Sequence, residues 1–201
     1  MVAFSGFPRI FLPQTSHRIS QHPKLFNYLL LFIVVESKGE NMSRKWIDDL
    51  QKIRSIADYQ FGRGVGKKLF PRDVRVVCSR RTGRIRYVYL GERRLATLRP
   101  TTGLLSLSIT GAKRIMENMK PPRLWIKVTD EAAPFVKKGK SVFAKHISDA
   151  DEEIRPMEEV IVISEEDEVL AVGKAVLTGE EMKAFKKGVA VKVRRGAAEE
   201  S

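Results

Sequence analysis

The sequence contains a single cysteine, Cys78, and only three histidines, His17, His22 and His146. One cysteine excludes a disulfide framework, an iron–sulfur cluster and a four-cysteine zinc site. The histidines have neither the HExxH spacing nor any other spacing that is typical of metal ligands. We therefore expect neither a metal ion nor any other cofactor in this chain.

A hydrophobic run long enough to span a bilayer is also missing. The apolar run at residues 25–35 has eleven residues, whereas a spanning helix needs about 20. Basic residues precede it as in a signal peptide, but no small-x-small cleavage site follows. We expect residues 1–42 to be a non-native or disordered extension and Met42 to be the true start, with a short membrane anchor as the alternative. An intact Met1 terminus in protein made from the native gene would contradict this expectation.

Acidic residues are fewer than basic residues, and the excess of positive charge is confined mainly to one segment. Lys and Arg total 37 against 24 Asp and Glu, a net charge of +13. Residues 43–120 alone carry +13, whereas residues 1–42 carry +2 and residues 121–201 carry −2. Charge concentrated in one segment is typical of a surface that binds a polyanion, although a generally solvated surface is the alternative. The composition therefore predicts a cytoplasmic, nucleic-acid-binding protein that is not an enzyme in its own right.

Residues 43–120 predict a small α+β domain. One apolar stripe indicates a helix that begins at Ser43 and ends near Tyr59; it consists of Trp46, Leu50, Ile53 and Ala57. Alternation with period two predicts an antiparallel sheet of about four strands, over residues 74–79, 84–90, 94–99 and 104–109. The last of these strands is expected to be half-buried. A second helix is expected over 111–119 and is stopped by two prolines.

Basic residues gather at three places in this domain. The glycine-rich segment 62–66 matches neither a P-loop nor a dinucleotide-binding fingerprint, but it lets the backbone approach an anion closely. A glycine-rich turn with solvated lysines is the alternative interpretation. Arginine suits phosphate oxygens because its planar fork presents several donors. The candidate RNA contacts are Arg63, Lys67 and Lys68 beside the glycines, Arg80, Arg81, Arg84 and Arg86 at the first hairpin, and Lys113 and Arg114 on the second helix.

Residues 121–196 predict a second, mostly β domain, followed by a tail at 197–201. Strands are expected over residues 124–129, 140–147, 159–163, 169–177 and 188–194. Short helices are expected over 130–138, capped by Asp130 and ended by Gly139, and over 178–187. So many short strands in about seventy residues are typical of a barrel-like sheet. We interpret the acidic stretch 149–168 as a solvated face rather than a metal or acid–base site.

Several ungapped blocks resemble a known family. Residues 53–66, 81–86 and 96–104 resemble the patch-forming domain of archaeosine tRNA-guanine transglycosylase. Residues 136–145, 151–156, 171–173 and 181–194 resemble the PUA domain that follows it there. The resemblance runs from about residue 45 to 196. It implies an α+β fold class, in which a small helix-flanked antiparallel sheet domain precedes a mostly-β PUA pseudo-barrel.

The resemblance also implies tRNA binding. In that family the PUA domain holds the acceptor stem and the 3′ CCA end. The residues that match its contact surface are Lys137, Lys138, Gly139, Lys140, Ser141, Phe143 and Lys145. An exposed aromatic ring among lysines suits a terminal nucleotide, whereas the alternative places Phe143 in the core.

The catalytic barrel of the family, with two aspartates and a cysteine-rich zinc site, has no counterpart in this sequence. We therefore expect a non-catalytic tRNA-binding protein, the detached C-terminal subunit of a split archaeosine transglycosylase that serves a separate catalytic chain, with no membrane partner. A stand-alone PUA protein acting in other tRNA or rRNA modification or in ribosome assembly is the alternative. An independent enzyme is the third class, but Cys78 and His146 make no credible nucleophile pair.

Overall fold

The computed structural model describes residues 45–119 and 123–199. The predicted N-terminal extension, the capping residue Ser43 and the two prolines at 121–122 lie outside the described residues. Below, residues 45–119 are called the first module and residues 123–199 the second module. No helix in these two ranges is long and apolar enough to cross a membrane.

The first module opens with a helix that covers residues 45–61. The predicted stripe is confirmed at Leu50, Ile53 and Ala57, which are buried, and Phe61 extends it by one more turn. Its first member, Trp46, is exposed, so the prediction is wrong at that position. The helix therefore ends two residues beyond the expected position, where Gly62 adopts a left-handed φ of 107°. A short helix that the sequence pattern did not predict, α2 (Val65–Leu69), follows at once.

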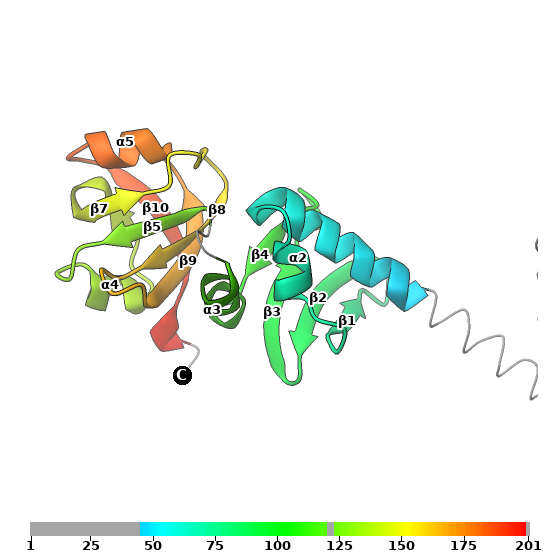
Figure 1. Cartoon of the computed structure of the whole chain (residues 1–201). Helices are drawn as coiled ribbons and strands as arrows, with labels where there is room; N and C mark the ends of the chain where they lie inside the picture. The colour runs from blue at the N-terminus through cyan, green and yellow to red at the C-terminus, as the bar shows by residue number, and fades with distance from the viewer. Residues whose placement is uncertain (1–44, 120–122, 200–201) are drawn as a thin grey trace, which may run out of the picture. The chain divides into compact units, whose positions relative to one another are not determined.

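A four-stranded antiparallel sheet follows, as predicted, in the order β1-β2-β3-β4 (Figure 1). Its strands are β1 (Arg75–Cys78), β2 (Ile85–Leu90), β3 (Arg93–Leu98) and β4 (Leu105–Leu107). The expectation that β4 is half-buried is wrong, because Ser106 is buried like its two leucine neighbours. The Ser106 hydroxyl accepts a hydrogen bond from Arg99 Nε, which removes the cost of burying it.

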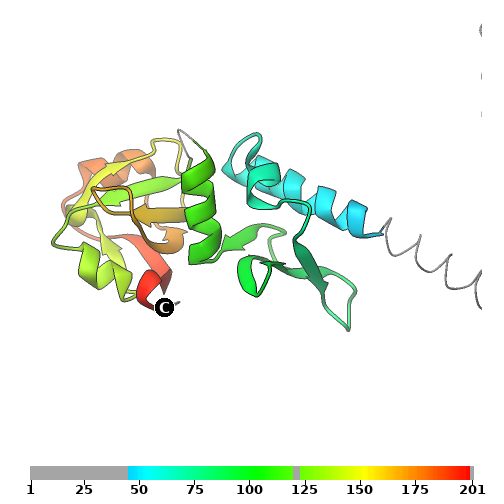
Figure 2. The same cartoon turned by 60° about the horizontal axis from the view of Figure 1, so that its bottom comes forward.

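Helix α3 (Ile109–Asn118) lies between the two sheets in both views (Figures 1 and 2). It begins two residues earlier than expected because Ser108 caps it. The Ser108 hydroxyl accepts a hydrogen bond of 3.0 Å from the backbone N–H of Gly111. The helix contacts β3 of the first module and β9 of the second.

The second module is built on a six-stranded sheet of order β6-β10-β9-β8-β5-β7, in which only the β5–β8 pair is parallel. The strands are β5 (Trp125–Val128), β6 (Val142–Phe143), β7 (Ile147–Ala150), β8 (Glu159–Ile163), β9 (Val169–Ala175) and β10 (Val189–Gly196). Helix α5 (Gly179–Ala184) carries a capping box between Thr178 and Glu181. The expected fold class is confirmed.

Two local expectations for the second module are wrong. The single strand expected over 140–147 is divided into β6 and β7 by a 3₁₀ turn (Ala144–His146), because these strands belong to opposite edges of the sheet. The expected cap Asp130 makes no capping bond, and helix α4 (Ala133–Lys137) begins after Ala132 instead. The predicted helix stop is confirmed, since Gly139 adopts a φ of 85° just beyond α4.

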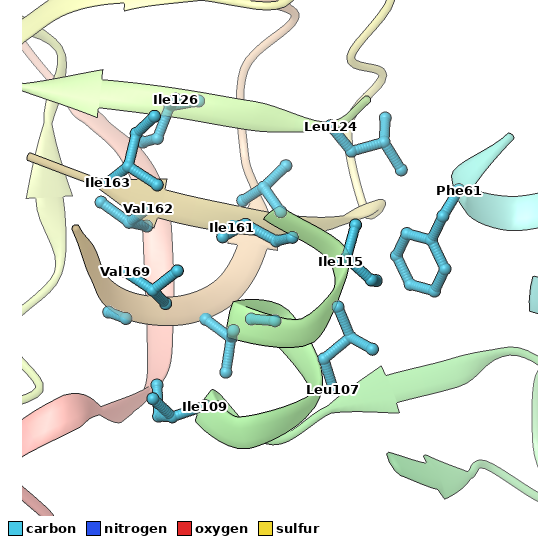
Figure 3. Close-up of a cluster of buried hydrophobic side chains, with 14 of the residues drawn as sticks. Phe61, Leu107, Ile109, Ile115, Leu124, Ile126, Ile161, Val162, Ile163 and Val169 are labelled. Atoms are coloured by element: carbon cyan, nitrogen blue, oxygen red, sulfur yellow. The ribbon is translucent and has the colours of Figure 1, made fainter. Parts of the chain in front are cut away.

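The two modules share a continuous hydrophobic core. Phe61, Leu107 and Ile115 from the first module face Leu124 and Ile161 from the second (Figure 3). All five side chains are no more than 1% exposed. Since apolar burial stabilises by about 25 cal/mol per Å², this contact joins the two modules firmly.

A buried ionic cluster adds to this junction. Most carboxylates of residues 149–168 are exposed or half-buried, as expected, but Glu159 is only 5% exposed. It pairs with Arg194 and, at 3.5 Å, with Arg99, and it accepts a hydrogen bond of 2.9 Å from the backbone N–H of Leu107. Burial raises the pKa of the Glu159 carboxyl, and Arg194, the Leu107 amide and Arg99 oppose that rise.

Candidate nucleic-acid interface

The β1–β2 hairpin presents four arginines at its tip. Two backbone hydrogen bonds of 2.8 Å close the turn, from the Ser79 N–H to the Arg84 carbonyl and from the Gly83 N–H to the Ser79 carbonyl. The four side chains are all exposed, and we call them the hairpin arginines: Arg80, Arg81, Arg84 and Arg86. The Arg86 Cζ lies 5.3 Å from the Tyr87 ring centroid. A fixed turn with exposed guanidinium groups can follow a phosphate backbone without rearrangement of the fold.

One face of the same sheet carries arginines stacked on tyrosines. Arg75, Tyr89 and Arg94 are aligned across β1, β2 and β3, and the Arg75 Cζ lies 4.9 Å from the Tyr89 ring centroid. The Arg94 Cζ lies 5.8 Å from the centroid of Tyr87, whose ring meets Tyr89 edge to face. Alternation along the second strand placed both tyrosines on one face. The arginines beside these tyrosines come from the neighbouring strands β1 and β3. Their position depends on strand pairing, and for this reason Arg75 and Arg94 could not be predicted from the sequence.

A groove of about 730 Å³ opens beside this face, where the first module meets the end of β10. We call it the junction groove. Its cations are Arg93 and Arg94 of β3, Lys113 and Arg114 of α3, and Arg195 of β10. Only Lys113 and Arg114 were sequence candidates. The other three come from two strands, β3 and β10, whose proximity no local pattern reveals.

Of the basic residues around α2, Lys68 is the one that hydrogen bonds connect to helix α3 beside the groove. Arg114 Nε donates a hydrogen bond of 2.8 Å to the Lys68 carbonyl, and Lys68 Nζ donates one of 2.5 Å to the Asn118 carbonyl. These bonds hold Lys68 beside the groove. Lys67 and Arg63 are exposed on α2 and on the glycine-rich turn, respectively, and in the described part of the chain neither forms a hydrogen bond or an ion pair with another candidate. Their role in RNA binding stays a prediction.

The predicted contact surface of the second module follows the turn after α4 and the edge strand β6. Lys138, Lys140 and Lys145 are exposed, whereas Lys137 pairs with Glu168 at 2.9 Å. Gly139 and Ser141, both half-buried, lie between them. A Cβ at Gly139 would lie 2.6 Å from a Glu199 carboxylate oxygen, so a larger residue would displace that side chain.

Phe143 is exposed rather than in the core, with 46% of its surface accessible. It lines a pocket of about 390 Å³, which we call the PUA pocket, together with Lys145, His146, Lys186, Lys187 and Gly188. The sequence analysis missed Lys186 and Lys187 because it assigned them to a helix over 178–187. Helix α5 in fact ends at Ala184, which leaves both lysines on the loop before β10.

Cys78 is the last residue of β1 and lies directly before the hairpin turn. Its thiol donates to Asp49 Oδ2 at 3.8 Å, and burial and then the charge of Asp49 raise the pKa of the thiol above 9.0. We predict that Cys78 reacts with iodoacetamide more slowly than a free thiol at pH 8 and that Asp49→Asn accelerates the reaction, measured by mass spectrometry. Equal rates for Cys78 and a model thiol would contradict this.

Within the described ranges, no group of three His, Cys, Asp or Glu could hold a metal ion.

Solved structures share this architecture. A hypothetical protein from Pyrococcus horikoshii OT3 superimposes with a TM-score of 0.62 at 24% identity, over 75% of this chain and 90% of that protein. A PUA domain from Aeropyrum pernix K1 gives a TM-score of 0.56 at 11% identity, over 73% and 80% of the two chains. At these identities the likeness shows a common fold.

Sequence relatives are much closer. The tRNA-guanine(15) transglycosylase of Methanothermobacter thermautotrophicus is 47% identical over 150 residues, which cover 75% of this chain and 23% of that enzyme. The enzyme of the same name from Pyrococcus abyssi is 46% identical over 184 residues, covering 88% and 31%. The chain spans about a quarter of the length of the curated relatives it matches. The resemblance drawn from the sequence blocks is thereby confirmed.

Family models match almost all of the two modules. One describes the patch-forming domain C2 of tRNA-guanine transglycosylase and matches residues 51–122. The other describes the PUA domain and matches residues 124–197. The four-stranded sheet with its exposed arginines lies in the first match, and the PUA pocket lies in the second. This chain therefore belongs, over residues 51–122, to the patch-forming C2 family of tRNA-guanine transglycosylase and, over residues 124–197, to the PUA family.

Proposed function

We propose that this chain is the tRNA-binding part of an archaeosine tRNA-guanine transglycosylase, non-catalytic by itself, which acts as a detached C-terminal subunit beside a separate catalytic chain. The second module binds the acceptor stem and the 3′ CCA end. The first module holds the phosphate backbone through its arginines. Together they position the tRNA for the catalytic chain. The names of the relatives and the charge of residues 43–120 support tRNA as the ligand.

The observation that carries the proposal is the exposed ring of Phe143 in a pocket bordered by lysines. An aromatic side chain on a soluble protein is usually covered, because exposing it forfeits apolar burial. Here the ring faces solvent beside Lys145, Lys186 and Lys187. A terminal nucleotide offers a base to stack on the ring and phosphates for the lysines, so it satisfies both parts of the pocket.

Removal of the ring tests the assignment of the CCA end to this pocket. Because stacking of one base contributes about 1–3 kcal/mol, Phe143→Ala should weaken binding of intact tRNA by roughly tenfold. The same substitution should not affect a tRNA trimmed of its CCA. The measurement is fluorescence anisotropy with the full chain and both tRNAs, at two salt concentrations.

The matched control is Tyr59→Ala, which removes an aromatic ring that is 82% exposed on the helix at 45–61, outside the pocket. It should leave both affinities unchanged. Equal binding of intact and trimmed tRNA by the unsubstituted protein would contradict the acceptor-end assignment. Equal binding of tRNA and an unrelated RNA duplex would contradict a dedicated role in tRNA modification.

The separate catalytic chain is tested by affinity purification of this protein from its native host. The proposal predicts that a transglycosylase barrel with its own zinc site co-purifies, in a complex that survives nuclease treatment. Association that disappears with the RNA, or no barrel at all, would leave a stand-alone tRNA-binding protein.

A further inference from the structure

We propose that a pocket beside the β1–β2 hairpin is a binding site for one unpaired nucleotide of an RNA, with the base inside the pocket and the phosphates on the hairpin arginines. The pocket has a volume of about 750 Å³ and is called the hairpin pocket below. It shares no lining residue with the junction groove or with the PUA pocket. The inference rests on the proposed function and extends it, because it adds contact with a base to a module that was assigned phosphate contacts alone.

Three segments that are distant in the sequence form the hairpin pocket. The helix at 45–61 forms one wall, residues 82–85 form the second, and residues 98–100 with 103 form the third. The β1–β2 and β3–β4 turns lie at the same end of the sheet, because consecutive strands run in opposite directions. Backbone hydrogen bonds close both turns; in the second, the Gly103 N–H donates to the Arg99 carbonyl at 2.8 Å. The walls of the pocket are therefore formed before a ligand arrives.

Each of the three segments contributes an apolar side chain to the hairpin pocket. These side chains are Ile56, Ile85 and Leu98. All three are only partly buried, since each packs against the hydrophobic core and keeps part of its surface accessible. Removal of apolar surface from water is favourable, and a flat nucleobase that enters the pocket covers this surface. The apolar lining therefore favours a base over a hydrated phosphate.

Polar groups with unused hydrogen-bonding capacity lie beside these apolar side chains. Gln51, Ser55 and Thr82 line the pocket and are exposed. In the part of the chain that the structure describes, their side chains form no hydrogen bond with another residue. An amide and two hydroxyl groups supply both donors and acceptors, which the edge of a base requires. The pocket thus combines an apolar surface for the ring of a base with polar groups for its edge.

The charge at the hairpin pocket favours an anionic ligand. Arg84 lines the pocket, and among the described residues no hairpin arginine forms an ion pair of 4.0 Å or less. The two other cations of the pocket are already paired. Arg99 contacts Glu159 at 3.5 Å, and Lys52 contacts Asp49 at 3.8 Å. An apolar protein segment would offer Arg84 no partner, whereas a nucleotide matches both the apolar surface and the charge.

The nucleotide must be unpaired to enter the hairpin pocket. A base in a duplex is stacked on its neighbours, and its Watson–Crick edge is already hydrogen-bonded, whereas a splayed-out base presents both its face and its edges to a protein. Ligand pockets generally measure about 300–1,000 Å³, so this one has room for a single nucleotide. The guanidinium plane of Arg84 can stack on the base or bind the adjacent phosphate.

The test obstructs the pocket without a change of charge. Ser55→Leu places a bulky side chain at an exposed position of the pocket wall, and the control Ser148→Leu makes the same exchange at an exposed serine of β7, outside the pocket. Both are made in the full chain with Phe143→Ala, so that the ring of the PUA pocket contributes no stacking. The probes are a short oligouridine and an abasic oligomer with the same number of phosphates, and binding is measured by fluorescence anisotropy at several salt concentrations.

Obstruction of the pocket should remove the contribution of one base. Ser55→Leu should therefore weaken oligouridine binding roughly tenfold and leave binding of the abasic oligomer unchanged. The slope of log K against log salt should stay the same, because no phosphate contact is lost. A second variant, Gln51→Ala with Thr82→Ala, removes hydrogen-bonding groups without adding volume and should weaken oligouridine binding severalfold. Circular dichroism melting confirms that the variants remain folded.

The outcomes separate this inference from the proposed function. Equal binding of the two probes, or equal oligouridine affinities of the Ser55→Leu and Ser148→Leu variants, would overturn the nucleotide pocket alone. If Ser55→Leu leaves RNA binding intact but releases the co-purifying transglycosylase barrel, the pocket is a protein-docking surface and the inference is wrong. If the unsubstituted protein binds no tRNA while Ser55→Leu still weakens oligouridine binding, the proposed function fails and the pocket stands.

Discussion

Exchange of the four hairpin arginines for glutamine is expected to weaken tRNA binding on the order of a hundredfold and to flatten its salt dependence. If each arginine contacts one phosphate, the slope of log K against log salt should fall by about 3. A loss of roughly 0.7 kcal/mol for each exposed charge pair gives about 3 kcal/mol in total, which corresponds to that change in affinity. Because these contacts are to phosphates, the loss should be similar for different tRNA sequences.

The effect is measured by fluorescence anisotropy of tRNA binding at several salt concentrations. The control variant carries Arg123→Gln, Arg155→Gln, Lys183→Gln and Lys192→Gln, which remove the same number of charges from exposed positions in the second module. A salt slope that matches this control would show that the hairpin does not contact phosphates. Because the hairpin turn is closed by backbone hydrogen bonds, the substitutions should leave the melting temperature nearly unchanged.

The largest expected effect on stability belongs to Glu159. Glu159→Ala removes the only carboxylate that Arg194 and Arg99 contact within 4.0 Å in the described part of the chain, and it leaves the Leu107 N–H without its acceptor. Loss of one partner of a buried pair costs about 3 to 5 kcal/mol. We expect the lower figure, because the two arginine side chains are 25% and 34% exposed and water can solvate them. The measurement is the free energy of unfolding from urea denaturation.

A surface pair provides the comparison for this substitution. Glu153→Ala breaks the pair with Arg123 at 2.6 Å, in which the side chains are 66% and 44% exposed. It should cost less than about 1 kcal/mol. Equal losses for the two variants would mean that the buried cluster does not hold the modules together. A larger loss for Glu159→Ala, with a single cooperative transition, would support the joined core at the junction.

Much of each module follows from local patterns. The buried stripe of the helix at 45–61 and the four strands of the first sheet lie close to their expected positions, because periods of 3.6 and 2 depend only on nearby residues. The predictions from the sequence are wrong where a residue or strand contacts a part of the chain that is distant in the sequence. Ser106 alternates as a surface residue would, but it is buried, and its hydroxyl accepts a hydrogen bond from Arg99 Nε. The strand expected over 140–147 is divided because its two halves belong to opposite edges of one sheet.

The sequence by itself determined the basic character of residues 43–120, the fold class, the family blocks and the arginines of the first hairpin, which are neighbours in the chain. Only the tertiary structure decided that Glu159 is buried among acidic neighbours that are mostly exposed, and that Arg93, Arg94 and Arg195 line one groove. It also decided that Phe143 is exposed beside Lys186 and Lys187. The reason is that burial and the meeting of charges depend on which elements pack together. This packing is determined by the pairing of strands that are distant in the sequence and by the shared core. A short stretch of sequence contains only one of the two elements that pack together.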